Sequence, residues 1–334
     1  MNYRHASLIS VLLTPIVLHA QQEASTLEEL CRRSRFVATA RLAEQHETQT
    51  SHEARFVASR WWKGERKGDL TFTEAARVHC GSALHGLETG KDYVLFFEAR
   101  GTRLRVLGGR RGLLLRSKDI EAAIQAMLNT SDPAARARLL AVQLSHEDRR
   151  IREDAALALA NLPGLEASSP ETRKLLLKHL DLEIQARTPS RLDSLLLASS
   201  RIDARGSAER AWTLALDERH AERSSLGREV LLRKIGSETT LTTVPMTRAR
   251  THRSRLLLLE VLTGTRSPRA LPWVEKLLTP KDPVLQREVA ISMLTLGSKP
   301  RELSKVLGKE LVLQAETLRN QRSRKPRLKA IRPR

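Results

Sequence analysis

The chain of 334 residues is long enough for about two domains, and 40% of its residues are hydrophobic. Its 58 lysines and arginines outnumber its 38 aspartates and glutamates, which gives a formal net charge of +20. Aromatic residues make up only 3% of the chain, too few for the stacking platforms of single-strand-binding proteins. We therefore expect no specific nucleic-acid partner. The charge points to anionic surfaces or acidic proteins, or to solvated arginines without a dedicated partner.

Residues 1–20 have the layout of a secretory signal peptide. Arg4 supplies the positive charge, residues 6–18 supply the apolar stretch, and Ala20 ends an acceptable cleavage site. The apolar run is too short to cross a bilayer. The alternative is a buried N-terminal helix. We expect an exported protein, periplasmic or secreted, whose mature chain begins at Gln21 and has no transmembrane segment.

Five short segments that follow the signal peptide are typical of β-strands. Their apolar, β-branched and aromatic residues alternate with polar ones, and glycines bound several of them. The predicted strands are residues 36–45, 55–64, 70–72, 92–99 and 103–107. Five short strands separated by glycine-rich turns predict a small barrel or sandwich.

Cys31 and Cys80 are the only two cysteines of the chain. Because an exported chain meets oxidising conditions, we expect them to form a disulfide. In the chain-entropy model, a bridge that closes a loop of this length stabilises the fold by roughly 4 kcal/mol, which matters for a barrel whose core is marginal. The alternative is a nucleophilic Cys80 activated by His79 or His85.

A series of short motifs runs through the predicted strands. Cys31 precedes the first strand, a later strand ends in aromatic-Lys-Gly, and a Cys-Gly pair is followed by Gly-x-x-Tyr-Val-Leu-Phe. Besides the cysteines, the residues of these motifs are Phe56, Trp62, Lys63, Gly64, Gly81, Gly90, Tyr93 and Phe96. This order resembles the netrin-type fold that the tissue inhibitors of metalloproteinases share. The resemblance covers about residues 28–115 and implies a five-stranded OB-type β-barrel, within a domain of residues 21–116.

The inhibitors bind the catalytic zinc of their target through the amine and carbonyl of an N-terminal cysteine. The resemblance therefore implies metalloprotease inhibition as one alternative function. Cleavage after Ala20 would leave Cys31 inside the mature chain, and the inhibitors carry more bridges than two cysteines allow. These differences favour a function in protein interaction over protease inhibition for this domain.

Residues 117–318 are rich in leucine and alanine at helical spacing. Two segments of this region look like copies of each other, one beginning at Asp148 and the other at Asp282, each with a capping aspartate and a small residue at the same offset. They lie about three periods of roughly 40–47 residues apart. The region resembles HEAT-like repeats, which implies a helical array with an extended binding surface. The alternative is an irregular helical bundle.

Residues 319–334 are basic, contain two prolines and have no acidic residue. We expect a disordered tail. It is a candidate for binding anionic surfaces such as lipid headgroups, lipopolysaccharide or acidic polysaccharide. Its candidate anion-binding residues are Arg322, Arg324, Lys325, Arg327, Lys329, Arg332 and Arg334.

No sequence motif marks a catalytic centre, because the chain has no HExxH, GxSxG, P-loop or dinucleotide fingerprint. His46, His52, His79 and His85 are close enough in sequence to share a zinc ion, but histidines of this kind are usually solvated loop residues. We expect no metal and no cofactor. The leading interpretation is a non-enzymatic interaction or scaffold protein of the bacterial envelope that binds a protein partner, there or outside the cell, through the barrel and the helical array.

Overall fold

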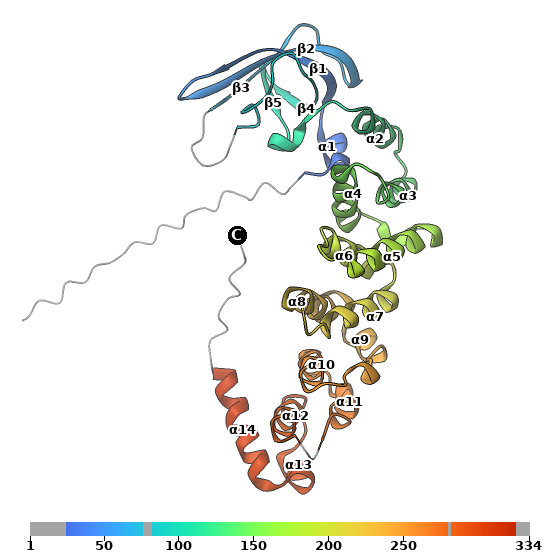
Figure 1. Ribbon diagram of the computed structural model, residues 1–334, viewed down its shortest axis with the longest axis vertical. Coiled ribbons are helices and arrows are strands. Elements are labelled where there is room, and N and C mark those ends of the chain that lie inside the picture. Colours follow the sequence, from blue (N-terminus) through green and yellow to red (C-terminus); the bar gives the residue numbers. More distant parts are fainter. Residues whose placement is uncertain (1–24, 76–81, 280–281, 325–334) are drawn as a thin grey trace, which may run out of the picture. The chain divides into compact units, whose positions relative to one another are not determined.

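The structure is a computed structural model that describes residues 25–75, 82–279 and 282–324. The chain divides into two compact units, Met1–Glu121 and Ala122–Arg334 (Figure 1). The first unit contains a β-sheet, and the second is built of helices. The predicted order of a β region followed by a helical region is confirmed. In the described part of the chain, no helix is both long and apolar enough to span a membrane.

A short helix, α1 (Leu27–Arg33), opens the first unit, and Thr26 caps it by accepting a hydrogen bond from the Glu29 N–H. The strands that follow are β1 (Phe36–Glu47), β2 (Ser51–Lys63), β3 (Leu70–Ala75), β4 (Asp92–Arg100), β5 (Arg103–Val106) and β6 (Leu113–Leu115). The structure places strands at all five predicted positions, although β1 and β2 run further than expected, as far as their connecting turn. The sixth strand was not predicted, because three consecutive leucines show no alternation.

The strands form one mixed sheet in the order β1-β2-β3-β5-β4-β6, and β1 also pairs with β4. The pairing of β3 with β5 is parallel and consists of one residue pair, Phe72 and Leu104, whereas the others are antiparallel. The structure thus has a six-stranded mixed sheet where we expected a five-stranded barrel. The difference arises because β6 adds to β4, and because β3 and β5 meet only briefly.

The pairing of β1 with β2 has three register irregularities, and at one of them β1 contains an extra residue. Leu42 lies opposite Phe56 and Glu44 lies opposite Arg55, so Ala43 has no partner on β2. Such a β-bulge reverses which side chains of a strand face the core. Before the bulge the even-numbered residues of β1, such as Leu42, are buried in the core of the sheet; after it the odd-numbered residues are on that inner face, because Gln45 lies opposite the buried Ala54.

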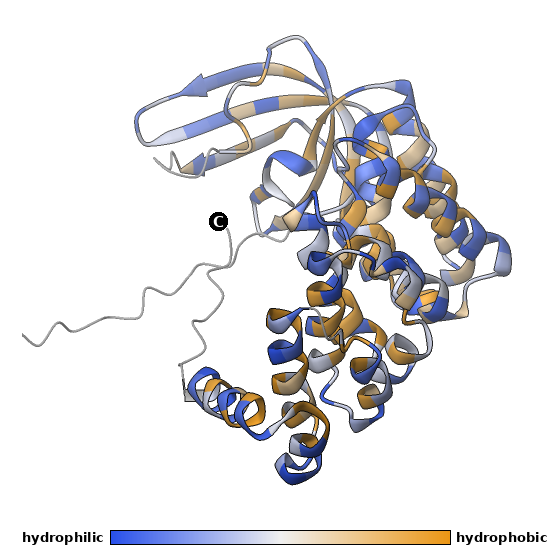
Figure 2. Ribbon diagram, turned by 60° about the horizontal axis from the view of Figure 1, so that its bottom comes forward, coloured by the Kyte–Doolittle hydropathy of each residue, from blue (hydrophilic) through white to orange (hydrophobic). Residues whose placement is uncertain are grey.

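The core of the first unit is formed by the inner faces of the strands and by a short loop segment ahead of β4. Ring pairs such as Phe56 with Phe72, 5.8 Å between centroids, and Phe72 with Phe97, 5.4 Å, pack edge to face. The loop contributes Ala83 and Leu84, which are both buried. The alternation of hydrophilic and hydrophobic residues along the long strands is visible in Figure 2.

The second unit is a succession of helices. They are α2 (Lys118–Asn129), which begins in the first unit, then α3 (Pro133–Gln143), α4 (Arg149–Asn161), α5 (Pro170–Gln185), α6 (Leu192–Ile202), α7 (Ala204–Ala215), α8 (Ala221–Val230), α9 (Ser237–Thr242), α10 (His252–Gly264), α11 (Leu271–Glu275), α12 (Pro283–Thr295), α13 (Pro300–Leu307) and α14 (Lys309–Arg324). The main helix–helix contacts join elements one or two places apart in this order, such as α5 with α6 and α7. Hydrophobic residues gather where these helices face one another (Figure 2).

The two segments that look like copies in the sequence adopt the same local structure. Asp148 caps α4 by accepting hydrogen bonds from the Arg150 and Ile151 N–H groups, and Asp282 caps α12 by accepting one from the Leu285 N–H. The small residue at the shared offset is an alanine that is fully buried in both helices, Ala156 in α4 and Ala290 in α12. The capping function predicted for both aspartates is confirmed.

The tail differs from its prediction at its beginning. Residues 319–324, which we expected to be disordered, form the last turns of α14. Arg322 forms a two-pronged ion pair with Glu288 of α12, at 2.7 and 2.9 Å, and the Arg319 guanidinium donates to the Leu294 carbonyl. These bonds attach the basic end of α14 to α12. The disorder that we predicted from the basic composition of residues 319–324 is therefore wrong for this part of the tail. The remaining candidates Lys325, Arg327, Lys329, Arg332 and Arg334 lie outside the described residues.

A buried polar cluster joins three elements of the helical unit. The Glu183 carboxylate accepts from the guanidinium of Arg191, at 2.6 and 2.8 Å, and from two backbone N–H groups. Arg191 also donates to the Leu144 carbonyl at 2.9 Å. Next to this pair, His179 is buried, and its Nε2 lies 2.9 Å from the Ser145 hydroxyl. The cluster fixes the loop between α5 and α6 against the end of α3.

We predict that Arg191→Met lowers the free energy of unfolding by about 3–5 kcal/mol, because it leaves the Glu183 carboxylate buried without its counter-charge. Denaturant unfolding followed by the helical circular dichroism signal measures this change. Arg205→Met is the matched control, since Arg205 forms an exposed 3.9 Å pair with Glu209 and its loss should cost under about 1 kcal/mol. Equal effects of the two substitutions would contradict the assignment.

The unfolding free energy should also fall as the pH is lowered through about 6.5, the ordinary pKa of histidine. Burial lowers the pKa of His179, and the charges of Arg191 and Lys178 lower it further, against the opposing effect of Glu183. The folded chain therefore binds fewer protons than the unfolded chain below that pH, so stability is lost on acidification. His179→Gln should flatten this part of the stability profile, and an unchanged profile would disprove the role of His179.

Candidate functional site

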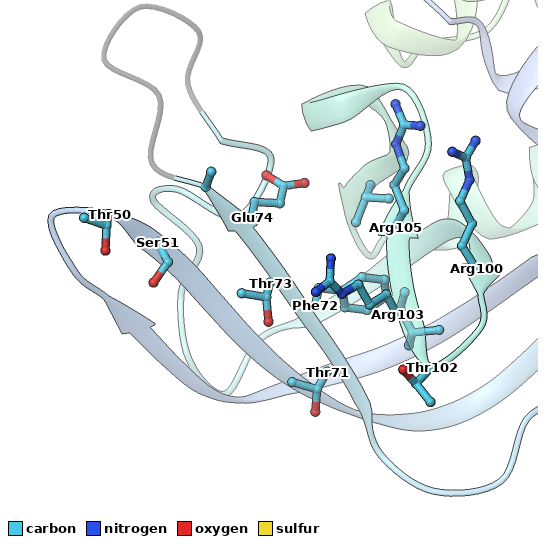
Figure 3. Close-up of a pocket in the computed structure, with 13 residues that line it drawn as sticks. Thr50, Ser51, Thr71, Phe72, Thr73, Glu74, Arg100, Thr102, Arg103 and Arg105 are labelled. Atoms are coloured by element: carbon cyan, nitrogen blue, oxygen red, sulfur yellow. The ribbon is translucent and has the colours of Figure 1, made fainter.

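A groove opens between β3 and β5 and is called the β3–β5 groove below. Its volume is about 780 Å³. Figure 3 shows Thr71 and Thr73 on β3 and Arg103 and Arg105 on β5, on the two sides of the groove. The side chains that line it are mostly hydroxyls and guanidiniums around an apolar floor: Thr50, Ser51, Thr71, Phe72, Thr73, Glu74, Ala75, Arg100, Thr102, Arg103, Leu104, Arg105 and Val106.

The groove exists because β3 and β5 separate on either side of a single contact. Among the described residues, Phe72 and Leu104 are the one pair that joins these strands. On its other edge β3 is paired with β2, and β5 is paired with β4. The facing edges of β3 and β5 therefore expose backbone groups that a further extended chain can pair with.

The charge of the groove is positive. Arg100 and Arg105 share the Glu98 carboxylate, at 3.0 and 3.9 Å, so two cations are balanced by one anion. Arg103 has no ion pair with any residue that the structure describes, and its side chain is exposed. The one acidic residue of the lining, Glu74, is already engaged, because its carboxylate accepts from the Ser82 hydroxyl and the Ala83 N–H. The groove is thus suited to anionic groups.

A second groove of about 830 Å³ lies in the helical unit between α10, α12 and α14. Its walls include the apolar residues Leu256, Leu259 and Ile291, and Val284 at its edge is 46% exposed. The ion pair of Arg322 with Glu288 borders it, and hydrogen bonding to Arg322 lowers the pKa of Glu288. Arg322, a candidate for anion binding in the sequence, is therefore already paired with a carboxylate. Arg324 is the last helical residue of α14.

Most residues of the netrin-type motifs lie in or next to the core of the first unit. Phe56, Tyr93 and Phe96 are buried, and the Tyr93 hydroxyl accepts from the Glu88 N–H at 2.8 Å. Gly90 occupies the turn before β4 with φ +83°, a conformation that favours glycine. Gly81 lies outside the described residues.

The aromatic-Lys-Gly motif at the end of β2 holds α1 in place. The Lys63 ammonium donates to the carbonyls of Cys31 and Arg32, at 2.8 and 3.2 Å, and so satisfies the last turn of the helix. Trp62 Nε1 donates to the Thr39 hydroxyl at 2.9 Å. Gly64 has φ +63°, and a Cβ at this position would lie 2.8 Å from the carbonyl oxygen of Arg35. These residues position the segment that leads into β1.

The predicted disulfide joins one described residue to one that is not described. Cys31 is buried in α1. Cys80 lies outside the described residues, so the bridge, and the alternative of a nucleophilic Cys80, stay predictions.

Of the four histidines that we grouped from the sequence, the three that the structure describes do not all lie together. His46 is exposed on β1, and His79 lies outside the described residues. The structure instead brings His52 and His85 together around Glu47, with ligand atoms of the three side chains within 4.8 Å of one another. The sequence did not indicate Glu47 as a ligand, because its acidic neighbours are typical of a solvated loop, whereas the bulge at Ala43 turns Glu47, not His46, to the inner face.

Comparison with known proteins gave no match: neither a scan of protein-family models nor a search of curated proteins found a similar sequence.

Proposed function

We propose that this chain is an exported, non-enzymatic interaction protein of the bacterial envelope. It binds a protein partner through the β3–β5 groove, and the helical array supplies a second contact surface. The observation that carries the proposal is the groove itself, in which two strand edges that pair only at Phe72 and Leu104 lie beside three arginines. Residues 1–20 as a signal peptide and a Cys31–Cys80 disulfide belong to the same proposal.

The chemistry of the groove favours an extended, acidic segment of the partner. An extended segment that lies beside the Phe72–Leu104 pair can form main-chain hydrogen bonds with the part of β3 or β5 that is not paired there, as in strand addition. Arginine binds carboxylates with two parallel hydrogen bonds, which gives both affinity and direction. Thr71 and Thr73 offer hydroxyls to the same segment. Phe72 and Leu104 form the apolar floor beneath these polar groups.

The finer description of the two units is also a proposal. A path of pairings runs from β1 through β2, β3, β5 and β4 and back to β1, with the β3–β5 pair parallel, which supports an OB-type barrel related to the netrin-type fold. Helix contacts confined to near neighbours support a HEAT-like array over an irregular bundle, since each repeat of such an array touches only its neighbours.

The two alternative functions have less support. Inhibition of a metalloprotease in the manner of the tissue inhibitors needs the Cys31 carbonyl as a zinc ligand, and this carbonyl accepts a hydrogen bond from Lys63. Binding of a polyanionic surface through residues 319–334 depends chiefly on the cations beyond residue 324, because Arg322 is already paired with Glu288.

The groove is tested with a fluorescent peptide that alternates glutamate and valine, titrated with the full chain at low salt. We expect binding that weakens with added salt. Reversing two charges with Arg103→Glu and Arg105→Glu together should weaken it at least about tenfold, which corresponds to about 1.4 kcal/mol.

Lys67→Glu is the matched control, because Lys67 is an exposed cation of the same unit outside the groove. It should leave the affinity within about twofold, apart from a small effect of net charge. If Lys67→Glu weakens binding as much as the double variant, the peptide responds to overall charge and the groove is not its site.

A further inference from the structure

The inner face of the sheet ends in a polar row. Across β1, β2 and β3, the register places Gln45, Ala54 and Phe72 side by side, and Ala54 and Phe72 are buried in the core. Two residues further along each strand, on the same face, the register places Glu47, His52 and Glu74 side by side. An acid, a histidine and a second acid thus border the hydrophobic core directly.

The polar row is built by the turn and the bulge of the β1–β2 hairpin. The bulge at Ala43 directs Glu47 inward, as described above. The turn is held by the Thr48 hydroxyl, which accepts from the Thr50 and Ser51 N–H groups at 3.3 and 2.9 Å. Because Glu47 and His52 are directly opposite each other across the hairpin, their side chains meet without any rearrangement.

The loop ahead of β4 adds His85 to this row. Glu74 holds the loop by accepting from the Ser82 hydroxyl at 2.6 Å and from the Ala83 N–H at 2.8 Å; Figure 3 shows Glu74 at the end of β3. Gln45 holds it from the other side, because its Nε2 donates to the Leu84 carbonyl at 2.8 Å. Leu84 is itself buried in the core, so the backbone that carries His85 is fixed on three sides.

The three side chains meet at distances that suit a metal ion. The Glu47 carboxylate oxygen Oε1 lies 3.5 Å from His52 Nδ1 and 3.3 Å from His85 Nδ1. In a tetrahedral zinc site with ligand bonds of about 2.1 Å, neighbouring ligand atoms are about 3.4 Å apart. The two imidazole rings, with centroids 5.7 Å apart and planes at 71°, do not stack on each other.

One of these ligand atoms has no hydrogen-bond partner among the described residues. His52 Nδ1 is buried and has no hydrogen bond among the described residues, and the His52 side chain is only 13% exposed. A buried polar atom without a partner is costly unless a ligand or water satisfies it. The Glu47 carboxylate, by contrast, accepts from Gln45 Nε2 at 2.8 Å, which orients it toward the histidines.

We propose that Glu47, His52 and His85 bind a zinc ion. Two imidazoles and one carboxylate are donors that suit zinc and related divalent transition metals, and not magnesium or calcium, which prefer oxygen ligands. Three protein ligands leave a fourth position open to water or to a group from a partner. The ion would clamp the tip of the β1–β2 hairpin to the loop ahead of β4. This inference does not depend on the function proposed for the β3–β5 groove.

An ion-pair cluster without metal is the competing explanation. Burial raises the pKa of Glu47, but the nearby His85 and His52 and the Gly86 N–H lower it more, so the carboxylate is ionised at neutral pH. Glu47 and His85 are 38% and 54% exposed, and ion pairs this exposed contribute little to stability. Such a cluster would also leave His52 Nδ1 without a hydrogen bond, whereas a zinc ion gives all three ligand atoms a partner.

The site is tested on the full chain after removal of metal with a chelator and alkylation of any free thiol. Titration with Zn²⁺ alone should give one tight equivalent, and Co²⁺ alone should give the visible absorption of a four-coordinate ion with nitrogen and oxygen ligands. His85→Gln and Glu47→Gln should each weaken zinc binding at least about tenfold. Zinc should raise the unfolding midpoint of the wild-type chain and not that of the variants.

His46→Gln is the control, because His46 is next to Glu47 in sequence but on the other face of β1. It should bind zinc as the wild type does. His85 lies in a loop and is mostly exposed, so its substitution should leave the fold intact, which circular dichroism checks. Wild-type affinity in both His85→Gln and Glu47→Gln, or no tight equivalent in the wild type, would overturn the proposal.

Discussion

The β-bulge at Ala43 decides which side chains at the end of β1 lie on the inner face of the sheet. Up to Leu42, the even-numbered side chains of β1 build the core, and β1 pairs with β2 on one edge and with β4 on the other. Beyond Ala43 the odd-numbered side chains take the inner face, so Gln45 and Glu47 continue it with polar groups. Without the extra residue, His46 would face inward and Glu47 outward, because a one-residue shift moves every side chain to the opposite face.

The same part of the sheet produces two surfaces of different character. On the inner face, Glu47, His52 and Glu74 border the core and are covered by the loop that carries His85. Along the open edge of β3, the brief contact of Phe72 with Leu104 leaves a basic groove. Glu74 serves both, since it lines the groove and holds the loop.

The helical unit is organised by contacts between helices that are close in the chain. Each helix contacts its near neighbours in the chain, and its ends are set by local caps such as Asp148 and Asp282. Such features can be recognised in a sequence, because an aspartate followed by helical apolar spacing has one simple interpretation. Five strand positions were predictable for the same reason, since alternation is a local signal.

Other features depended on contacts that no local pattern reveals. The bulge at Ala43 has no signature in the residues around it, so the sequence did not indicate that Glu47, and not His46, lies beside His52. The sixth strand forms because Leu113–Leu115 pair with the backbone of β4. Residues 319–324 are helical because Arg322 and Arg319 have partners on α12, whereas their composition resembles that of a disordered tail. In each case a tertiary contact outweighed local preference.

The central claim is that the bulge brings Glu47, His52 and His85 together as ligands of one ion. The most direct measurement is diffraction from crystals of the full chain grown with Zn²⁺, with data collected on both sides of the zinc absorption edge. We expect an anomalous peak between these three side chains, with Ala43 unpaired. A map in which Ala43 is paired with β2 and Glu47 points outward, or in which the zinc lies elsewhere, would contradict it.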